Sequence, residues 1–136
     1  MAIPKIIVIS LKNSTRRENI AKRLSGLGLD FTFFDATDGK KLPASVLESV
    51  DYDYPKHYLS PKSLTLGEIG CAISHIKVYE HMVENNIESA IILEDDAIVS
   101  QHFKEIVEDT LNKINKNHEL IFFDHGKVKS HFFKKR

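Results

Sequence analysis

Apolar residues along this chain form short continuous runs that alternate with longer segments of helical periodicity. Runs of strand length lie at residues 5–11, 31–34, 89–93 and 119–123. They are rich in β-branched and aromatic residues, which is typical of strands buried on both faces of a sheet. The pattern therefore predicts four strands.

The segments between the first three runs carry helix-start and helix-end signals. Asn, Ser and Thr at 13–15 favour the start of a helix over 16–24, which Gly26 and Gly28 can end. Thr65 and Glu68 form a capping box, because each side chain can satisfy a free backbone N–H at a helix start. The helix that follows should run to about Asn85.

Apolar side chains spaced by threes and fours predict the inward face of each later helix. For the capping-box helix they are Ile69, Ala72, Ile73, Ile76, Tyr79 and Val83. Ser100 can begin another helix, for which they are Phe103, Ile106, Val107, Leu111 and Ile114.

Strands and helices alternate in this prediction, with a turn at 35–39 and a less regular segment at 40–64. Alternation of this kind indicates an α/β fold with a Rossmann-like, mostly parallel sheet and helices on both faces. Ligands of such sheets bind beyond the carboxyl ends of the strands. Chemistry is therefore expected where a strand ends.

Composition narrows the function only slightly. The 136 residues fit one domain, and 42% hydrophobic with 28% charged residues is an ordinary globular balance. There are 19 basic and 19 acidic residues, so the net charge gives no indication of a nucleic-acid partner. Residues 131–136 are locally basic and aromatic.

The single cysteine, Cys71, excludes an intrachain disulfide and favours a reducing compartment. It has no evident catalytic partner in the sequence, and we interpret it as a packed small residue. The apolar run at 6–11 is too short for a signal peptide or a membrane span. We therefore expect a cytoplasmic protein.

An acidic triplet, Glu94, Asp95 and Asp96, directly follows the third predicted strand. Acidic residues before a helix can simply favour the helix dipole. Their place at a strand end favours a metal site instead, in which alternation sends Glu94 and Asp96 to one side and Asp95 to the other. Oxygen ligands suit Mg²⁺ or Mn²⁺, which can hold a substrate diphosphate.

Three basic residues, Lys12, Arg16 and Arg17, lie where the first strand gives way to a helix. Free N–H groups at a helix start favour an anion, and Arg makes two-pronged contacts with phosphate. A solvated helix face is the ordinary alternative for each of them. The sequence has no glycine-rich phosphate loop, so neither a Walker site nor a dinucleotide fingerprint is supported.

Glu68 and His75 are seven residues apart and so lie on nearly the same face of the capping-box helix. Both are candidates for catalysis. A capping carboxylate is the ordinary interpretation of Glu68, and a hydrogen-bonded, half-buried histidine is the ordinary interpretation of His75. The sequence leaves both open.

Five motifs in order resemble those of family 25 glycosyltransferases, which include lipooligosaccharide and collagen galactosyltransferases. They are VISL at 8–11, STRR at 14–17, FDATDG at 34–39, LGEIGCAISH at 66–75 and ILEDD at 92–96. The resemblance spans about residues 5–126. Each motif alone is weak, and their common order makes the resemblance specific.

The resemblance implies a GT-A-type fold, a UDP-sugar donor that is often UDP-galactose, a divalent metal (Mn²⁺ or Mg²⁺), inversion at the anomeric carbon and a lipooligosaccharide acceptor. It implies that residues 94–96 are the DxD-like motif, with Asp96 as a metal ligand and Glu94 second. The residues expected to hold the nucleotide sugar are Arg16, Arg17, Asp38 and Asp95.

The resemblance also implies a truncated domain, since relatives continue well beyond Gly126. We expect residues 1–126 to be the N-terminal half of a nucleotide-sugar-binding domain and 127–136 to be a tail. The missing half normally completes the acceptor site and supplies the base. Its absence predicts slow or no transfer and exposed apolar surface, which favours self-association or peripheral membrane contact. The residues expected there are Phe122, Phe123, Phe132 and Phe133.

Two other classes stay open. One is a non-catalytic UDP-sugar binder, which the short length favours. The other is a receiver-like signalling domain, whose fold needs an acidic pair after the first strand. Residues 11–13 here are Leu, Lys and Asn, so the receiver hypothesis is the weaker one.

Overall fold

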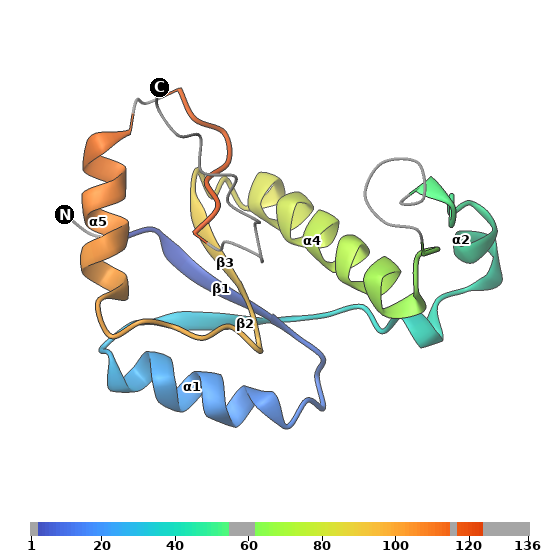
Figure 1. Ribbon diagram of the computed structural model, residues 1–136, viewed down its shortest axis with the longest axis horizontal. Helices are drawn as coiled ribbons and strands as arrows, with labels where there is room; N and C mark the ends of the chain where they lie inside the picture. Colours follow the sequence, from blue (N-terminus) through green and yellow to red (C-terminus); the bar gives the residue numbers. More distant parts are fainter. Residues whose placement is uncertain (1–2, 55–61, 115–116, 124–136) are drawn as a thin grey trace, which may run out of the picture.

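A computed structural model of the protein describes residues 3–54, 62–114 and 117–123, and it shows a small parallel sheet with helices around it (Figure 1). The elements in chain order are β1 (Lys5–Ser10), α1 (Arg16–Gly26), β2 (Phe31–Asp35), the short 3₁₀ helix η1 (Gly39–Lys41), α2 (Ala44–Glu48), α4 (Leu66–Glu84), β3 (Ala90–Glu94) and α5 (Phe103–Lys113).

The sheet has three strands in the order β2-β1-β3, and both pairings are parallel. β1 is the central strand, and its residues after Lys5 are all buried, which explains why its sequence is almost continuously apolar. Ile9 pairs with Phe34 on one side and with Glu94 on the other. The carboxyl ends of all three strands therefore meet at one edge of the sheet.

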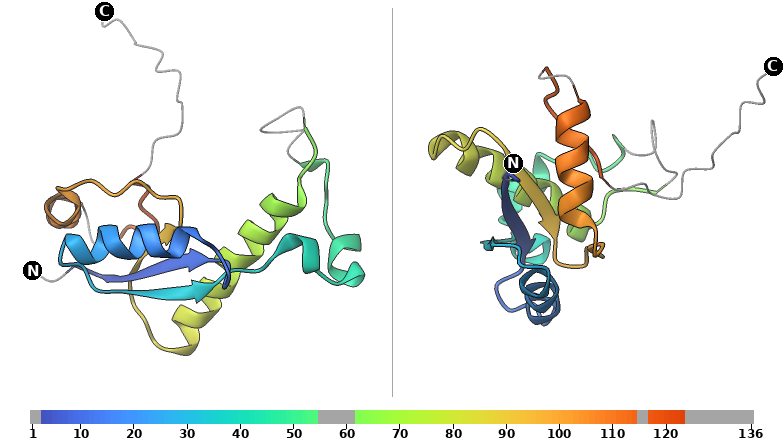
Figure 2. Two further views of the ribbon diagram at one scale, coloured as in Figure 1. Left: turned by 90° about the horizontal axis from the view of Figure 1, so that it is seen from below. Right: turned by 90° about the vertical axis from the view of Figure 1, so that its left-hand side faces the viewer.

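Alternate side chains of β1 point to opposite faces of the sheet, and each face has its own core. Ile6 and Val8 pack in a cluster with residues of α1 and α5, whereas Ile7 and Ile9 pack with Val78 of α4. Figure 2 shows α1 and α5 on one side of the sheet and α4 on the other. The predicted α/β architecture with helices on both faces is confirmed.

The first helix ends as its glycines predict. Gly28 has a φ of +67°, and the N–H of Leu29 donates to the carbonyl of Leu24 at 3.0 Å. This is the hydrogen-bond pattern of a Schellman cap, which favours glycine at the left-handed position. Gly26 is the last residue of α1 rather than its cap.

The fourth predicted strand is not present, because residues 117–123 contain no strand. The apolar run that suggested it lies outside the core: Leu120 is 63% exposed and Phe122 is 80% exposed. An apolar run forms a buried strand only where a sheet edge and a covering layer are available to it. Exposure of Phe122 and Phe123 agrees with the apolar surface expected there, while Phe132 and Phe133 lie outside the described residues.

The inward face of α4 also differs from the prediction. Ile69 is buried, but Ile76 is 53% exposed and Val83 is 79% exposed. The helix instead buries small residues near its start and Val78 farther along; the buried set is Ile69, Gly70, Ser74 and Val78. Small residues let this helix approach the backbone of the 37–39 turn closely, which the count of apolar positions could not indicate.

The last helix, α5, follows its prediction at most positions. Val107 is buried, and Phe103 and Leu111 pack against the core of the α1 side. Ile106, expected to face inward, is 46% exposed. Ser100 contributes to the helix start by accepting a hydrogen bond from the His102 N–H, although His102 is the capping residue itself. No helix of the described residues is long and apolar enough to cross a membrane.

Candidate functional site

The acidic triplet follows β3 at the edge where the strands end. β3 stops at Glu94, and a turn closed by the Ala97 N–H on the Glu94 carbonyl (3.0 Å) carries Asp95 and Asp96. Because strand geometry ends at Glu94, the expected alternation fails beyond it. Glu94 faces α4, whereas Asp95 and Asp96 both lie on the α1 side.

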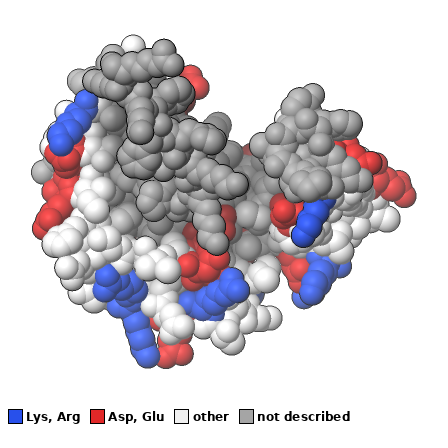
Figure 3. Space-filling model, in the orientation of Figure 1, with Lys and Arg blue, Asp and Glu red and all other residues white. Residues whose placement is uncertain are grey.

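A hollow of about 300 Å³ lies between the start of α1 and this turn. Its lining residues are Arg16, Asn19, Ile20, Arg23, Asp95, Asp96 and Ala97. Figure 3 shows basic and acidic side chains next to each other on this face, at the lower centre of the view. Arg16 and Asp96 thus open onto one cleft at the strand ends, as the parallel topology predicts.

Asp95 is fixed by a hydrogen-bond network at the back of this hollow. Its Oδ2 accepts hydrogen bonds from Ser10 Oγ at 2.7 Å and Ser14 Oγ at 2.8 Å, and its Oδ1 lies 3.5 Å from Arg16 Nη1. Burial by itself would raise the pKa of Asp95, but the two serine hydrogen bonds and the Arg16 charge outweigh it and lower this pKa. The network therefore fixes the position of the Asp95 side chain and favours its ionised form.

Replacing Ser10 with alanine tests this network. We expect Ser10→Ala to lower the free energy of unfolding at neutral pH by about 1.5–3 kcal/mol, because one hydrogen bond to a charged acceptor is lost. Since the folded-state pKa of Asp95 is depressed, its stabilisation is present above the ordinary aspartate pKa of about 3.9 and is lost as the pH falls through the folded value. Urea unfolding across pH should thus show the difference shrinking in acid.

Ser25→Ala, at an exposed position of α1, is the matched control and should show no such pH dependence. A Ser10→Ala difference that stays constant from neutral pH down to strongly acidic pH would mean that the loss comes from packing and not from Asp95.

Arg17 is engaged away from the hollow. Its Nη2 pairs with Asp35 and donates to the Ser10 carbonyl at 2.8 Å, and its guanidinium lies 4.7 Å from the centre of the Phe33 ring. These contacts tie the ends of β1 and β2 together. Of the basic residues at the β1–α1 junction, Arg16 alone lines the hollow, while Lys12 is exposed.

Two other predicted residues have structural partners. Asp38 accepts a hydrogen bond from the Lys40 N–H at 3.0 Å and caps η1, and it does not line the hollow. Glu68 completes the capping box of α4, with its Oε2 2.7 Å from the Thr65 nitrogen. The hydrogen bonds from the Thr65 backbone and side chain lower the pKa of Glu68.

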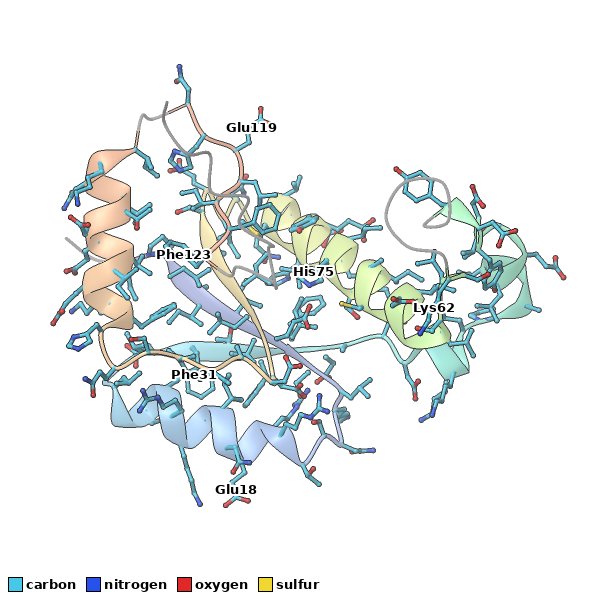
Figure 4. All side chains as sticks on the ribbon, viewed as in Figure 1. Glu18, Phe31, Lys62, His75, Glu119 and Phe123 are labelled. Atoms are coloured by element: carbon cyan, nitrogen blue, oxygen red, sulfur yellow. The ribbon has the colours of Figure 1, made fainter. Side chains whose placement is uncertain are left out.

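A second cluster lies on the other side of the triplet, where α4 meets the end of β3. Glu94 Oε1 accepts a hydrogen bond from Cys71 Sγ at 3.3 Å and lies 3.1 Å from His75 Nε2. In Figure 4, His75 is on the side of α4 that faces β3. Cys71 as a residue is exposed, but partial burial of its thiol, with Glu94 next, raises the pKa of the thiol to about 11, so it is protonated at neutral pH.

Sequence reasoning singled out His75 and Glu94 separately and missed their partner. Cys71 is exposed, so its interpretation as a packed residue is wrong. The signal was available in part: Cys71 and His75 are four residues apart on a helix, which places two ligand-type side chains on one face. The third member could not be found without knowing that α4 crosses the end of β3.

Comparison with known sequences now adds the family. The sequence model described as "Glycosyltransferase family 25 (LPS biosynthesis protein)" matches residues 3–136. The chain belongs to glycosyltransferase family 25. This result confirms the resemblance that the five ordered motifs carry, and it makes the protein a member of a family of sugar-transferring enzymes.

Three animal proteins are among the relatives that this chain resembles. The chain is 33% identical over 129 residues to a glycosyltransferase 25 family member of Aedes aegypti, which covers 90% of this chain and 21% of the relative. It is 30% identical over 129 residues to human procollagen galactosyltransferase 2, and the match covers 90% of this chain and 21% of that protein. It is also 30% identical over 118 residues to a Bos taurus protein named "Probable inactive glycosyltransferase 25 family member 3". This match covers 84% of this chain and 20% of that protein.

This family 25 chain spans about a fifth of the length of these curated relatives. The matched region includes the ends of β1 and β3, the start of α1 and the cluster between α4 and β3. Both candidate clusters therefore lie within the part that the family shares.

Proposed function

We propose that this family 25 chain binds a UDP-hexose with a divalent metal in the hollow beside α1 and transfers the hexose to a hydroxyl group. The observation that carries the proposal is the convergence of Arg16, Asp95 and Asp96 on one hollow at the carboxyl ends of β1 and β3. Family membership supports the class of reaction. The topology supports the position, because ligands of open parallel sheets bind at this end.

Asp96 is our first candidate for the metal ligand, since it lines the hollow and is exposed. Carboxylate oxygens suit Mn²⁺ or Mg²⁺, so the donor set of the hollow fits this ion class. The metal would neutralise the charge of the leaving diphosphate. Glu94, our second candidate, faces Cys71 and His75, and it can join Asp96 only by leaving these partners.

The other residues of the hollow bind and orient the donor in this proposal. Arg16, which is 63% exposed at its side chain, can reach a phosphate. Asp95 is held by two serines and can accept hydrogen bonds from ribose or sugar hydroxyls. Of the two candidates for catalysis, Glu68 is occupied by its capping hydrogen bonds, and His75 lies 3.1 Å from Glu94 on the α4 side, outside the hollow, so the proposal assigns no general base.

For the donor we propose UDP-galactose and for the acceptor lipooligosaccharide, in a cytoplasmic reaction at the inner face of the membrane. The family description names lipopolysaccharide biosynthesis, whereas the human relative is named for procollagen. Both acceptors offer hydroxyl groups. An assay of galactose transfer should therefore include a lipooligosaccharide arm and a procollagen-peptide arm, and we expect the lipooligosaccharide arm to react.

Amide resonances in solution test where the donor binds. We expect UDP-galactose with Mg²⁺ to shift the signals of Arg16, Asp95, Asp96 and their neighbours. A second hollow of about 390 Å³ lies at the amino ends of the strands and provides an internal control. Its lining includes Ile3, Gly28, Asp30 and Lys104. Shifts confined to this second hollow would contradict the proposal.

A non-catalytic donor-binding role is the second candidate, and the relative named as probably inactive favours keeping it. Release of free UDP separates the two. A transferase releases UDP in proportion to the sugar that reaches the acceptor, whereas a binder shows the same resonance shifts with no UDP release. Either result leaves the binding part of the proposal testable by itself.

A further inference from the structure

Three side chains with different donor atoms converge between α4 and the end of β3. The ligand atoms of Cys71, His75 and Glu94 all lie within 4.8 Å of one another. They offer a sulfur, an imidazole nitrogen and a carboxylate oxygen. No other group of three such residues lies this close together within the described part of the chain.

The fold holds these side chains in place before any ligand arrives. Cys71 and His75 lie one turn apart on α4, which the capping box starts and Val78 anchors in the core. Glu94 is the last residue of β3 and pairs with Ile9 of the central strand. Because two rigid elements carry the donors, little order has to be created on binding.

The cluster is open on one side. Cys71 is exposed, the Glu94 side chain is 50% exposed and the His75 side chain is 29% exposed. A cation can therefore enter from solvent, and water can complete its coordination. Three protein ligands with one open position is an arrangement that zinc sites use.

We propose that Cys71, His75 and Glu94 form a binding site for a thiophilic divalent cation, of which zinc is the principal biological example. The sulfur and nitrogen donors distinguish this site from the hollow, where the candidate metal ligands are carboxylates, because thiolate and imidazole select zinc-like ions over Mg²⁺. On binding, the Cys71 thiol loses its proton to solvent and the thiolate becomes a ligand. The inference does not depend on the proposed sugar transfer.

Cobalt(II) provides the direct probe, since a cobalt–thiolate bond gives a charge-transfer absorption band that oxygen and nitrogen ligands do not give. We expect the full chain, freed of metal, to develop this band with one equivalent of Co²⁺ and to lose it when Zn²⁺ is added. Calorimetric titration with Zn²⁺ should show one site with release of protons.

Variants assign the ligands. Cys71→Ser should abolish the cobalt band, and Cys71→Ser, His75→Gln and Glu94→Gln should each weaken Zn²⁺ binding at least about tenfold. His102→Gln is the matched control, because His102 forms an exposed pair with Glu105 at 3.2 Å that has no thiol nearby; it should bind Zn²⁺ as the wild type does. Unfolding curves in chelator verify that each variant is folded.

The inference is overturned if the folded wild type gives no cobalt–thiolate band, or if Cys71→Ser binds Zn²⁺ as tightly as the wild type. Asp96→Ala separates the two sites: it removes a charge that acts on Cys71 but none of the three ligands, so the cobalt–thiolate band should remain. If Asp96→Ala removes Zn²⁺ binding while Cys71→Ser retains it, the ion lies in the hollow and the assignment to Cys71, His75 and Glu94 is wrong, whatever the outcome for sugar transfer.

Discussion

Asp96→Ala should weaken the Mn²⁺-dependent binding of UDP-galactose by about 100-fold and remove the difference between titrations with and without Mn²⁺. The reason is that Asp96 is the exposed carboxylate in the hollow and is not engaged by α4 as Glu94 is. Loss of outer partners of a metal site already costs about 10–100-fold in affinity, so loss of a direct ligand should reach the upper end of that range. Calorimetric titration measures both quantities.

The control for this variant is Asp109→Ala. Asp109 is an exposed carboxylate on α5 that pairs with Lys113 at 2.7 Å, and it lines neither hollow. It should bind donor and metal as the wild type does. If Asp96→Ala keeps full Mn²⁺ dependence, the metal is held by other residues and the assignment of Asp96 fails.

Gly39→Ala should be the most destabilising alanine substitution among the glycines of the described structure. A Cβ at position 39 would lie 1.7 Å from the Leu66 carbonyl oxygen, and one at position 70 would lie 2.7 Å from the Gly39 nitrogen. Both contacts are with backbone, which cannot rotate away. We expect each substitution to lower the free energy of unfolding by about 1–3 kcal/mol or more, as for other overpacked sites.

Gly67→Ala is the matched control, because it lies in the same turn of α4 and its added Cβ would meet only Thr65 Oγ1 at 3.9 Å. It should leave stability unchanged or raise it slightly, since alanine favours helix over glycine. Urea unfolding gives all three values. Equal stability of the position 39, 67 and 70 variants would show that α4 does not pack closely against the 37–39 turn.

The strands and helices that the sequence predicts well are those with one dominant local signal. The central strand is readable because a continuous β-branched run at 6–9 favours a strand buried on both faces over an amphipathic helix. The start of α4 can be predicted because the side chains of Thr65 and Glu68 each accept a hydrogen bond from the other residue's backbone N–H. Parallel pairing of β1 with β3 then follows from the alternation of strands and helices.

The failures have a common physical cause, which is that tertiary packing decided them. Residues 119–123 have the composition of a strand, yet no sheet edge receives them in the described structure. The face of α4 is set by close approach at Gly70 and Ser74, and so the larger apolar side chains of Ile76 and Val83 remain exposed. Neither effect can be detected from the local periodicity of apolar residues.

The candidate site was likewise predictable only where local sequence determines it, and not where tertiary contacts do. The sequence locates the acidic triplet and the basic cluster at strand ends, but it cannot choose between Arg16 and Arg17. That choice depends on the Asp35 and Phe33 contacts, which hold Arg17 against the sheet. It places the end of the third strand correctly, but it extends strand alternation through the triplet, whereas the turn after Glu94 brings Asp95 and Asp96 into one hollow.

The most direct test of the proposed function is a calorimetric titration of the wild-type chain with UDP-galactose, once with Mn²⁺ and once with chelator. The proposed metal site in the hollow at the ends of β1 and β3 predicts binding of one donor molecule with Mn²⁺ and at least about tenfold weaker binding without it. Equal binding in both titrations, or no binding in either, would contradict the proposed role of the hollow.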